Sequence, residues 1–149
     1  MVTTVGTESN LVDTLNNLIE LDYDAIEAYD AAIDRLDSAE YKARLKEFRD
    51  DHARHTRDLG AAVKELGGKP AQQGGAKSLL TRGKVMMADL LGDGAILQAM
   101  KSNEDDTNTA YERAVKAAEG TPAAATALQS GLADERRHRA WIEQALSAR

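Results

Sequence analysis

The chain has 149 residues and a formal net charge of −6, with 30% charged residues, 4% aromatic residues and no cysteine. This length supports one domain with a hydrophobic core that needs no disulfide bonds. The acidic balance argues against nucleic acid as the main partner, because phosphate binding needs a concentrated basic face. The lack of cysteine excludes thiol catalysis and thiolate metal sites.

The overall pattern is helical. No segment alternates apolar and polar residues as a half-buried strand does, so an all-α fold is expected. No apolar run is long enough to form a transmembrane helix, and the segment 1–10 is polar. Neither a membrane span nor a signal peptide is therefore predicted, and a cytoplasmic location is expected.

The first two predicted helices cover residues 9–36 and 38–66, where apolar residues recur at helical spacing. Asp37 is expected to cap the second helix, with Glu40 three residues later completing a capping box. Gly67, Gly68 and Pro70 are expected to end it. The short turn between the two helices predicts an antiparallel hairpin.

A connection over residues 67–93 follows. It begins with polar and glycine residues, and its segment from Ser78 to Leu91 carries seven large apolar side chains. We expect this segment to be a short helix packed on the bundle, because that apolar surface needs a partner. Its Met86–Met87 pair is expected to fill space in the core.

The last two predicted helices cover residues 94–119 and 122–147. Thr121 is expected to be the N-cap of the final helix and Pro122 its first residue. The prediction is therefore one domain over residues 1–149, a ferritin-like four-helix bundle of two antiparallel hairpins joined by one long crossover.

The two hairpins also repeat each other weakly. Tyr29 in the first hairpin corresponds to Tyr111 in the second, and Arg54-His55 corresponds to Arg137-His138. The shifts along the chain that relate these two pairs differ by a single position. Two related hairpins can bury their apolar stripes against each other about a pseudo-twofold axis.

Ionisable residues interrupt the apolar stripe of every predicted helix. The turn of the first hairpin is at Asp37 and that of the second is at Gly120. In each hairpin, the ionisable residues of the first helix precede the turn by about as many positions as those of the second helix follow it. Equal counts in antiparallel helices mean equal depth, at ~1.5 Å per residue. We therefore expect these six residues to meet in one layer halfway along the bundle: Asp22, His52, His55, Glu104, Glu135 and His138.

Three carboxylates and three imidazoles are costly to bury unless they are paired or bind cations. This combination suits iron, manganese and zinc, so one or two divalent ions are predicted as ligands. Salt bridges, or a hydrogen-bonded histidine pair in the core, are the structural alternatives. Asp24 and Asp51 are reserve ligands, whereas Tyr29 and Tyr111 are expected to pack two turns away from the layer.

Part of this pattern resembles the ferritin-like di-metal carboxylate proteins, which combine single glutamates on two helices with Glu-x-x-His on two others. Glu104 matches a single glutamate, and Glu135-Arg136-Arg137-His138 matches the full motif. The other half departs from it, with Asp22 for a glutamate and His52 for the second bridging glutamate.

The chain is also similar to a group of bacterial ferritin-like bundle proteins of unknown function. The similarity lies in segment 18–24, in Glu104-Asp105 ahead of Tyr111, and in the helix stop over 66–70. In that group the typical acid of the first helix corresponds to Asp24.

These resemblances imply a metal-binding protein, with iron or manganese oxidation, storage or peroxide-related stress protection as its roles. Ferroxidase-type catalysis would need two ions and a bridging carboxylate, and only Glu135 is expected to bridge. The asymmetric halves predict one tightly and one weakly bound ion. The alternative function is a non-catalytic stress or interaction protein whose polar layer binds no metal, and a homo-oligomer is compatible with either.

Overall fold

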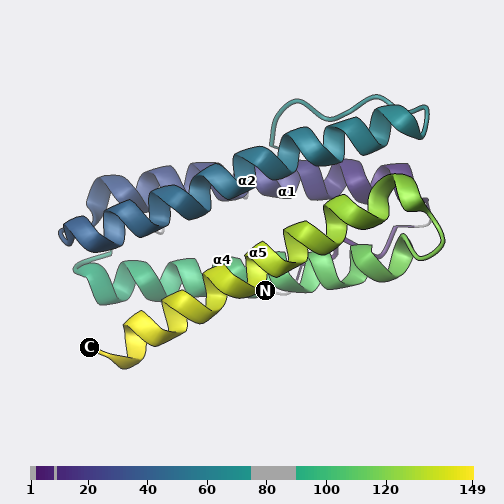
Figure 1. Cartoon of the computed structure of the whole chain (residues 1–149). Helices are drawn as coiled ribbons and strands as arrows, with labels where there is room; N and C mark the ends of the chain where they lie inside the picture. The colour runs from purple at the N-terminus through teal and green to yellow at the C-terminus, as the bar shows by residue number, and fades with distance from the viewer. Residues whose placement is uncertain (1–2, 9, 75–89) are drawn as a thin grey trace.

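The computed structural model describes residues 3–8, 10–74 and 90–149, which form four helices and no strand. The helices are α1 (Leu11–Arg35), α2 (Ala39–Glu65), α4 (Asp93–Ala117) and α5 (Pro122–Ser147). They pack side by side as an elongated bundle (Figure 1). The predicted all-α four-helix bundle is confirmed.

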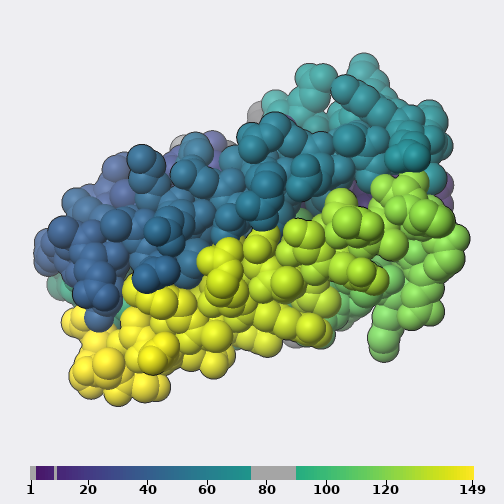
Figure 2. All heavy atoms as spheres, viewed as in Figure 1, coloured from purple at the N-terminus to yellow at the C-terminus, as the bar shows by residue number. Residues whose placement is uncertain are grey.

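The order of the helices sets which of them are neighbours. α1 packs on α2 and α4, and α5 packs on α4 and α2. α2 and α4 start at the same end of the bundle, and α2 ends at the opposite end (Figure 1). α2 and α5 lie against each other along one face of the molecule (Figure 2).

The start of α2 differs from the prediction. Ser38, not Asp37, is the N-cap, and its hydroxyl accepts a hydrogen bond from the Tyr41 N–H at 3.2 Å. The backbone N–H groups of Asp37 and Ser38 instead donate to the carboxylate of Asp93, at 2.8 and 3.0 Å. The first residue of α4 is thereby attached to the α1–α2 turn.

The other helix ends follow the predicted residues more closely. Gly67 has φ 83° and follows α2, where the Gly68 N–H donates to the Val63 carbonyl at 2.9 Å. These contacts satisfy carbonyls that the helix end leaves free. Thr121 is the N-cap of α5, but its side chain makes no capping hydrogen bond.

Most of the crossover segment predicted as a short helix, 78–89, lies outside the described residues. Its last two residues, Leu90 and Leu91, are not helical. Leu90 packs against the core, whereas Leu91 is 88% exposed. None of the described helices is long and apolar enough to span a membrane.

The core consists of two apolar clusters at different heights in the bundle. One contains Leu15, Leu18, Leu59 and Leu128, and the other contains Phe48 and Met100 among its members. The residues between the two clusters are polar and buried. The bundle therefore encloses a polar layer that is closed above and below by packed apolar side chains.

Candidate metal centre

The polar layer contains all six residues expected from the helix register. Each is at most 3% exposed, and each helix supplies at least one of them. Their ligand atoms form two groups of four within the described part of the chain, and in each group all four atoms lie within 4.8 Å of one another. The groups are Asp22, His52, His55 and Glu135, and His52, Glu104, Glu135 and His138.

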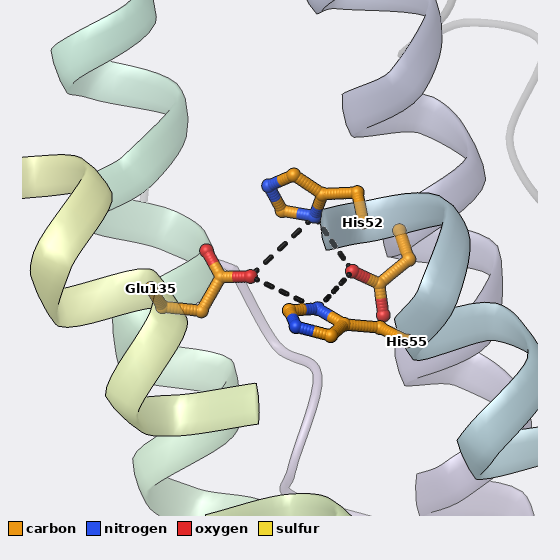
Figure 3. A group of neighbouring side chains, drawn as sticks. His52, His55 and Glu135 are labelled. Carbon is orange, nitrogen blue, oxygen red and sulfur yellow. Dashed lines mark hydrogen bonds and ion pairs between the residues drawn. The ribbon is translucent and has the colours of Figure 1, made fainter. Parts of the chain in front are cut away.

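The first group arranges four donor atoms around one point (Figure 3). Asp22 Oδ1 lies 2.7 Å from His52 Nδ1 and 3.3 Å from His55 Nδ1. Glu135 Oε1 lies 3.4 Å from each of the same two nitrogens. Four ligands at ~2.0–2.1 Å from a tetrahedral ion are roughly 3.3–3.4 Å apart, so three of these four distances suit such an ion.

The second group lies on the other side of the His52 ring. Glu104 Oε1 lies 3.4 Å from His52 Nε2 and 3.3 Å from His138 Nδ1. Glu135 completes this group. Both groups therefore combine imidazole nitrogens with carboxylate oxygens.

Glu135 contains the one carboxylate oxygen in the described layer that has no hydrogen-bond partner. Its Oε2 accepts a hydrogen bond from the Thr107 hydroxyl at 2.7 Å, whereas the buried Oε1 accepts none and has ion pairs with His52 and His55 at 3.4 Å as its polar contacts. An unsatisfied buried oxygen is costly and is usually explained by an ion or water. Since Oε1 faces the nitrogens of His52 and His55, the residues present fit a cation at this position.

Carboxylates determine the protonation of the histidines. Burial lowers the pKa of His52, but the charge of Glu135 and the bond with Asp22 raise it to about 10. Burial lowers the pKa of His55 likewise, but Asp22 and Asp134 raise it to about 12. Without a bound cation, both rings are therefore protonated on both nitrogens and positively charged at neutral pH.

The pKa values of the two buried glutamates shift in opposite directions. Burial raises the pKa of Glu135 to about 7, with a further contribution from the charge of Glu104. Burial also acts to raise the pKa of Glu104, but hydrogen bonds with His138 and His52 bring it well below its ordinary value. The layer thus balances its own charges with protons that a metal ion would have to displace.

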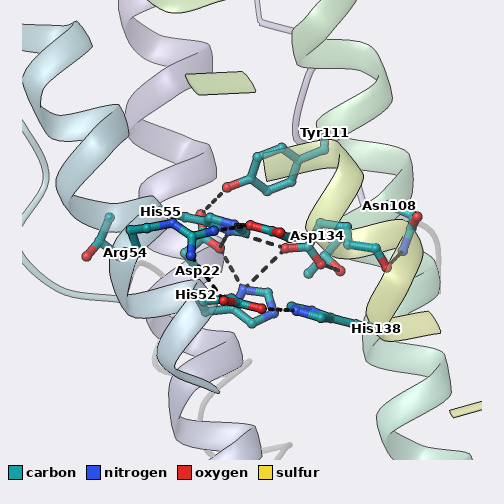
Figure 4. A network of polar contacts seen from close by, with 12 residues as sticks. Asp22, His52, Arg54, His55, Asn108, Tyr111, Asp134 and His138 are labelled. Carbon is teal, nitrogen blue, oxygen red and sulfur yellow. Dashed lines mark hydrogen bonds and ion pairs between the residues drawn. The ribbon is translucent and has the colours of Figure 1, made fainter. Parts of the chain in front are cut away.

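Two further carboxylates hold the outward nitrogens of the histidines. Asp134 of α5 contacts His55 of α2 (Figure 4), with Asp134 Oδ2 2.9 Å from His55 Nε2. Asp51 Oδ2 of α2 lies 2.8 Å from His138 Nε2 of α5. The Nδ1 atoms of both rings are thereby directed into the layer. Metal-binding histidines are commonly oriented in this way by a carboxylate on their other nitrogen.

Arginines cover these outer carboxylates at the α2–α5 surface. Arg54 contacts Asp51 at 3.1 Å and also pairs with Asp134, while Arg137 contacts Asp51 at 2.6 Å and Asp134 at 3.2 Å. Burial acts to raise the pKa of Asp51, but bonds with His138 and Arg137 hold it below its ordinary range. Both aspartates therefore stay charged beside the imidazoles.

Two buried tyrosines also contact the layer, contrary to the prediction that they only pack. Tyr29 of α1 donates its hydroxyl to Glu104, and Tyr111 of α4 donates to Asp22 Oδ2 at 2.7 Å. Each tyrosine follows the acid on its own helix by two turns. Side chains on a helix tilt toward its N-terminus, so both rings extend back to the layer.

The polar contacts of the layer occur in pairs that correspond in the internal repeat. A shift of 82 positions relates α1 to α4, and a shift of 83 positions relates α2 to α5. The Tyr29–Glu104 bond then corresponds to the Tyr111–Asp22 bond, and the His55–Asp134 contact corresponds to the His138–Asp51 contact. The pseudo-twofold expected from two residue pairs therefore extends through the polar layer.

The reserve ligands lie elsewhere. Asp24 is half-buried outside both groups, and burial raises its pKa to about 6, with contributions from Glu20 and Glu27. Asp51 belongs to neither group but contacts His138, as described above. Sequence reasoning missed Asp134 altogether. Its position directly before Glu135 matches that of Asp51 before His52.

Comparison with curated proteins found no match, and comparison with solved structures found none. Residues 10–117 match the model of a domain family of unknown function, DUF2383. The matched range runs from the N-cap of α1 to the last residue of α4 and includes Asp22, His52, His55 and Glu104. The match spans most of the chain, and the protein is a member of the DUF2383 family.

Proposed function

We propose that this protein binds divalent metal at the buried layer, with Asp22, His52, His55, Glu104, Glu135 and His138 as the ligand set. The observation that carries the proposal is the fully buried Oε1 of Glu135, which accepts no hydrogen bond and lies 3.4 Å from two imidazole nitrogens, its ion-pair partners when the rings are protonated. A cation would satisfy this oxygen together with the other donors of its group.

The donor chemistry limits which ion is expected. Imidazole nitrogen and carboxylate oxygen together suit zinc, iron and manganese. A bound ion of this kind would supply Lewis acidity and, with iron or manganese, redox chemistry. The protein's own residues would fix the ligands, since Asp51 and Asp134 orient two rings while Tyr29 and Tyr111 hold two carboxylates.

The finer role rests on the resemblance to ferritin-like di-metal proteins. We propose that the protein belongs to that superfamily and that it oxidises or stores iron or manganese, or protects against peroxide. The Glu135-x-x-His138 motif and the long return connection between α2 and α4 support this role.

One observation favours the alternative function, a bundle whose polar layer binds no metal. Three imidazoles and three carboxylates balance in charge when the rings are protonated, as the raised pKa values of His52 and His55 favour. A self-neutral layer of this kind would fix the pairing of the helices without a cation.

Metal analysis of protein purified without chelator separates the two functions. We expect bound iron, manganese or zinc in the wild type and a large loss in His138→Ala. Glu27→Ala is the matched control, because Glu27 is exposed on α1 and belongs to neither ligand group. Equal metal content in all three proteins would contradict the proposed function.

A further inference from the structure

Two residues, His52 and Glu135, belong to both ligand groups. They are 83 positions apart and therefore correspond to each other in the internal repeat. Residues that correspond about a pseudo-twofold and are shared by both halves of a site lie at its centre. The structure thus gives His52 the same central position as Glu135, although its side chain is an imidazole.

The His52 ring presents one nitrogen to each group. Nδ1 lies 2.7 Å from Asp22 Oδ1 and 3.4 Å from Glu135 Oε1. Nε2 lies on the opposite side of the ring, 3.4 Å from Glu104 Oε1. The ring is fully buried, so neither nitrogen has access to bulk water.

Surrounding rings hold His52 in this orientation. Its ring centroid lies 5.4 Å from that of Tyr29, 5.5 Å from that of His55 and 5.3 Å from that of His138. His55 and His138 are themselves bonded to Asp134 and Asp51 through their outer nitrogens. A rotation of the His52 ring would therefore disturb both groups at once.

We propose that His52 bridges two divalent ions as an imidazolate, with Nδ1 in the first group and Nε2 in the second. This inference rests on the proposed metal-binding function and specifies how the site holds its ions. Glu135 would be the second shared ligand, while Asp22 and His55 would bind one ion and Glu104 and His138 the other.

Charge supports this arrangement. Binding through both nitrogens requires loss of both His52 ring protons to solvent, and that ring then carries one negative charge. His55 and His138 each lose one proton to solvent as their Nδ1 atoms bind, so these two rings are neutral. Together with three carboxylates, an imidazolate gives the layer four negative charges, which two divalent ions neutralise. A buried centre without net charge avoids the desolvation cost of an uncompensated ion.

The sequence pattern assigns His52 to one half of the site and on that basis predicts one tight and one weak ion. Since His52 faces both groups, removal of its ring should affect both ions, and most strongly the second to bind. A carboxylate at this position can also bridge, so His52→Glu should retain two ions without an imidazolate.

Titration of the metal-free protein with Cu²⁺, followed by electron paramagnetic resonance, tests the bridge directly. The chain contains three histidines, and all three lie in the layer, so nitrogen hyperfine structure from imidazole reports on this site. We expect a mononuclear signal at one equivalent. At two equivalents this signal should decrease through coupling of the two ions across the imidazolate.

The variants complete the test. His52→Ala should bind the second Cu²⁺ at least about tenfold more weakly, with no coupling, and His52→Glu should restore the two-ion stoichiometry. Binding of one ion per chain at saturation, or of two uncoupled ions in the wild type, would overturn the bridge and leave the metal-binding function intact. A second ion bound equally well by His52→Ala and the wild type would also overturn it. A wild-type protein that gives no imidazole-bound signal would refute both proposals.

Discussion

Tyr111 of α4 donates its hydroxyl to Asp22 Oδ2 of α1 at 2.7 Å, and both residues are buried. The bond joins the two hairpins at the level of the polar layer. Burial and the charge of Asp22 raise the pKa of Tyr111 well above its ordinary value, so the phenol remains a donor.

Tyr111→Phe should therefore destabilise the protein. A hydrogen bond to a charged group contributes about 1.5–3 kcal/mol, and its loss leaves Asp22 with fewer donors. For a chain of this size each kcal/mol corresponds to a change of roughly 2–4 °C in Tm. Thermal unfolding followed by circular dichroism measures the effect, with chelator present throughout.

Tyr23→Phe is the control, because the Tyr23 hydroxyl makes no hydrogen bond with another described residue and should change Tm little. An equal change in Tm for the two variants would show that the Tyr111 hydroxyl does not support the layer.

A second prediction concerns the glycine beneath that tyrosine. A Cβ added at Gly131 of α5 would overlap the Tyr111 ring, whereas a Cβ added at Gly60 of α2 would lie 3.6 Å from Pro70, an ordinary contact. Gly131→Ala should cost about 1–3 kcal/mol through overpacking. Gly60→Ala should be neutral or stabilising by up to about 1 kcal/mol, because alanine is the better helix former.

Urea unfolding of the two glycine variants compares their free energies of unfolding directly. A stable Gly131→Ala variant with wild-type free energy would mean that the Tyr111 ring is not packed against α5 as described.

The outer carboxylates should control metal affinity. Asp51 and Asp134 hold the Nε2 atoms of His138 and His55, and the loss of such orienting groups typically lowers metal affinity about 10–100-fold. Asp51→Asn and Asp134→Asn should each show this loss in a competition assay with a zinc-binding dye. Asp50→Asn is the matched control, since Asp50 is exposed and contacts only Arg49 at 3.4 Å among the pairs described. Unchanged affinity in both test variants would separate these aspartates from the site.

The stability of the metal-free protein should fall as pH rises above neutrality. A histidine whose folded pKa is raised contributes stability below its unfolded pKa of 6.5 and loses it as pH rises through the folded value. For His52 that loss runs from about pH 6.5 to about 10, and for His55 it continues to about 12. Tm of the chelator-treated protein should therefore be lower at pH 9 than at pH 7.

Metal binding should stabilise the protein more strongly as pH rises, because metal ions compete with protons for the same nitrogens. The difference in Tm between loaded and chelator-treated protein should grow from pH 6 to pH 9. A metal-free protein that gains stability over this range would contradict the protonated layer.

The sequence predicted the polar layer well because depth along a helix follows directly from residue counting. Asp22, His52 and Glu135 are found together because each interrupts an apolar stripe at a similar distance from a turn. The same periodicity predicted four helices with ends close to those observed.

The remaining features depend on side-chain direction and on neighbouring helices. Counting Cα positions puts Tyr29 and Tyr111 about 10 Å from the layer and therefore predicts packing alone. Their length and their tilt toward the helix N-terminus close that distance. Asp51 and Asp134 flank the apolar stripes, and their role follows from the α2–α5 contact, which no single-helix pattern contains.

Anomalous diffraction can locate metal ions bound in the buried layer. Crystals of protein purified without chelator would be measured on both sides of the iron, manganese and zinc absorption edges. We expect a peak among Asp22 Oδ1, His52 Nδ1, His55 Nδ1 and Glu135 Oε1, with a second peak on the Glu104 side of the His52 ring. A map without any peak in this layer would contradict the proposed metal binding.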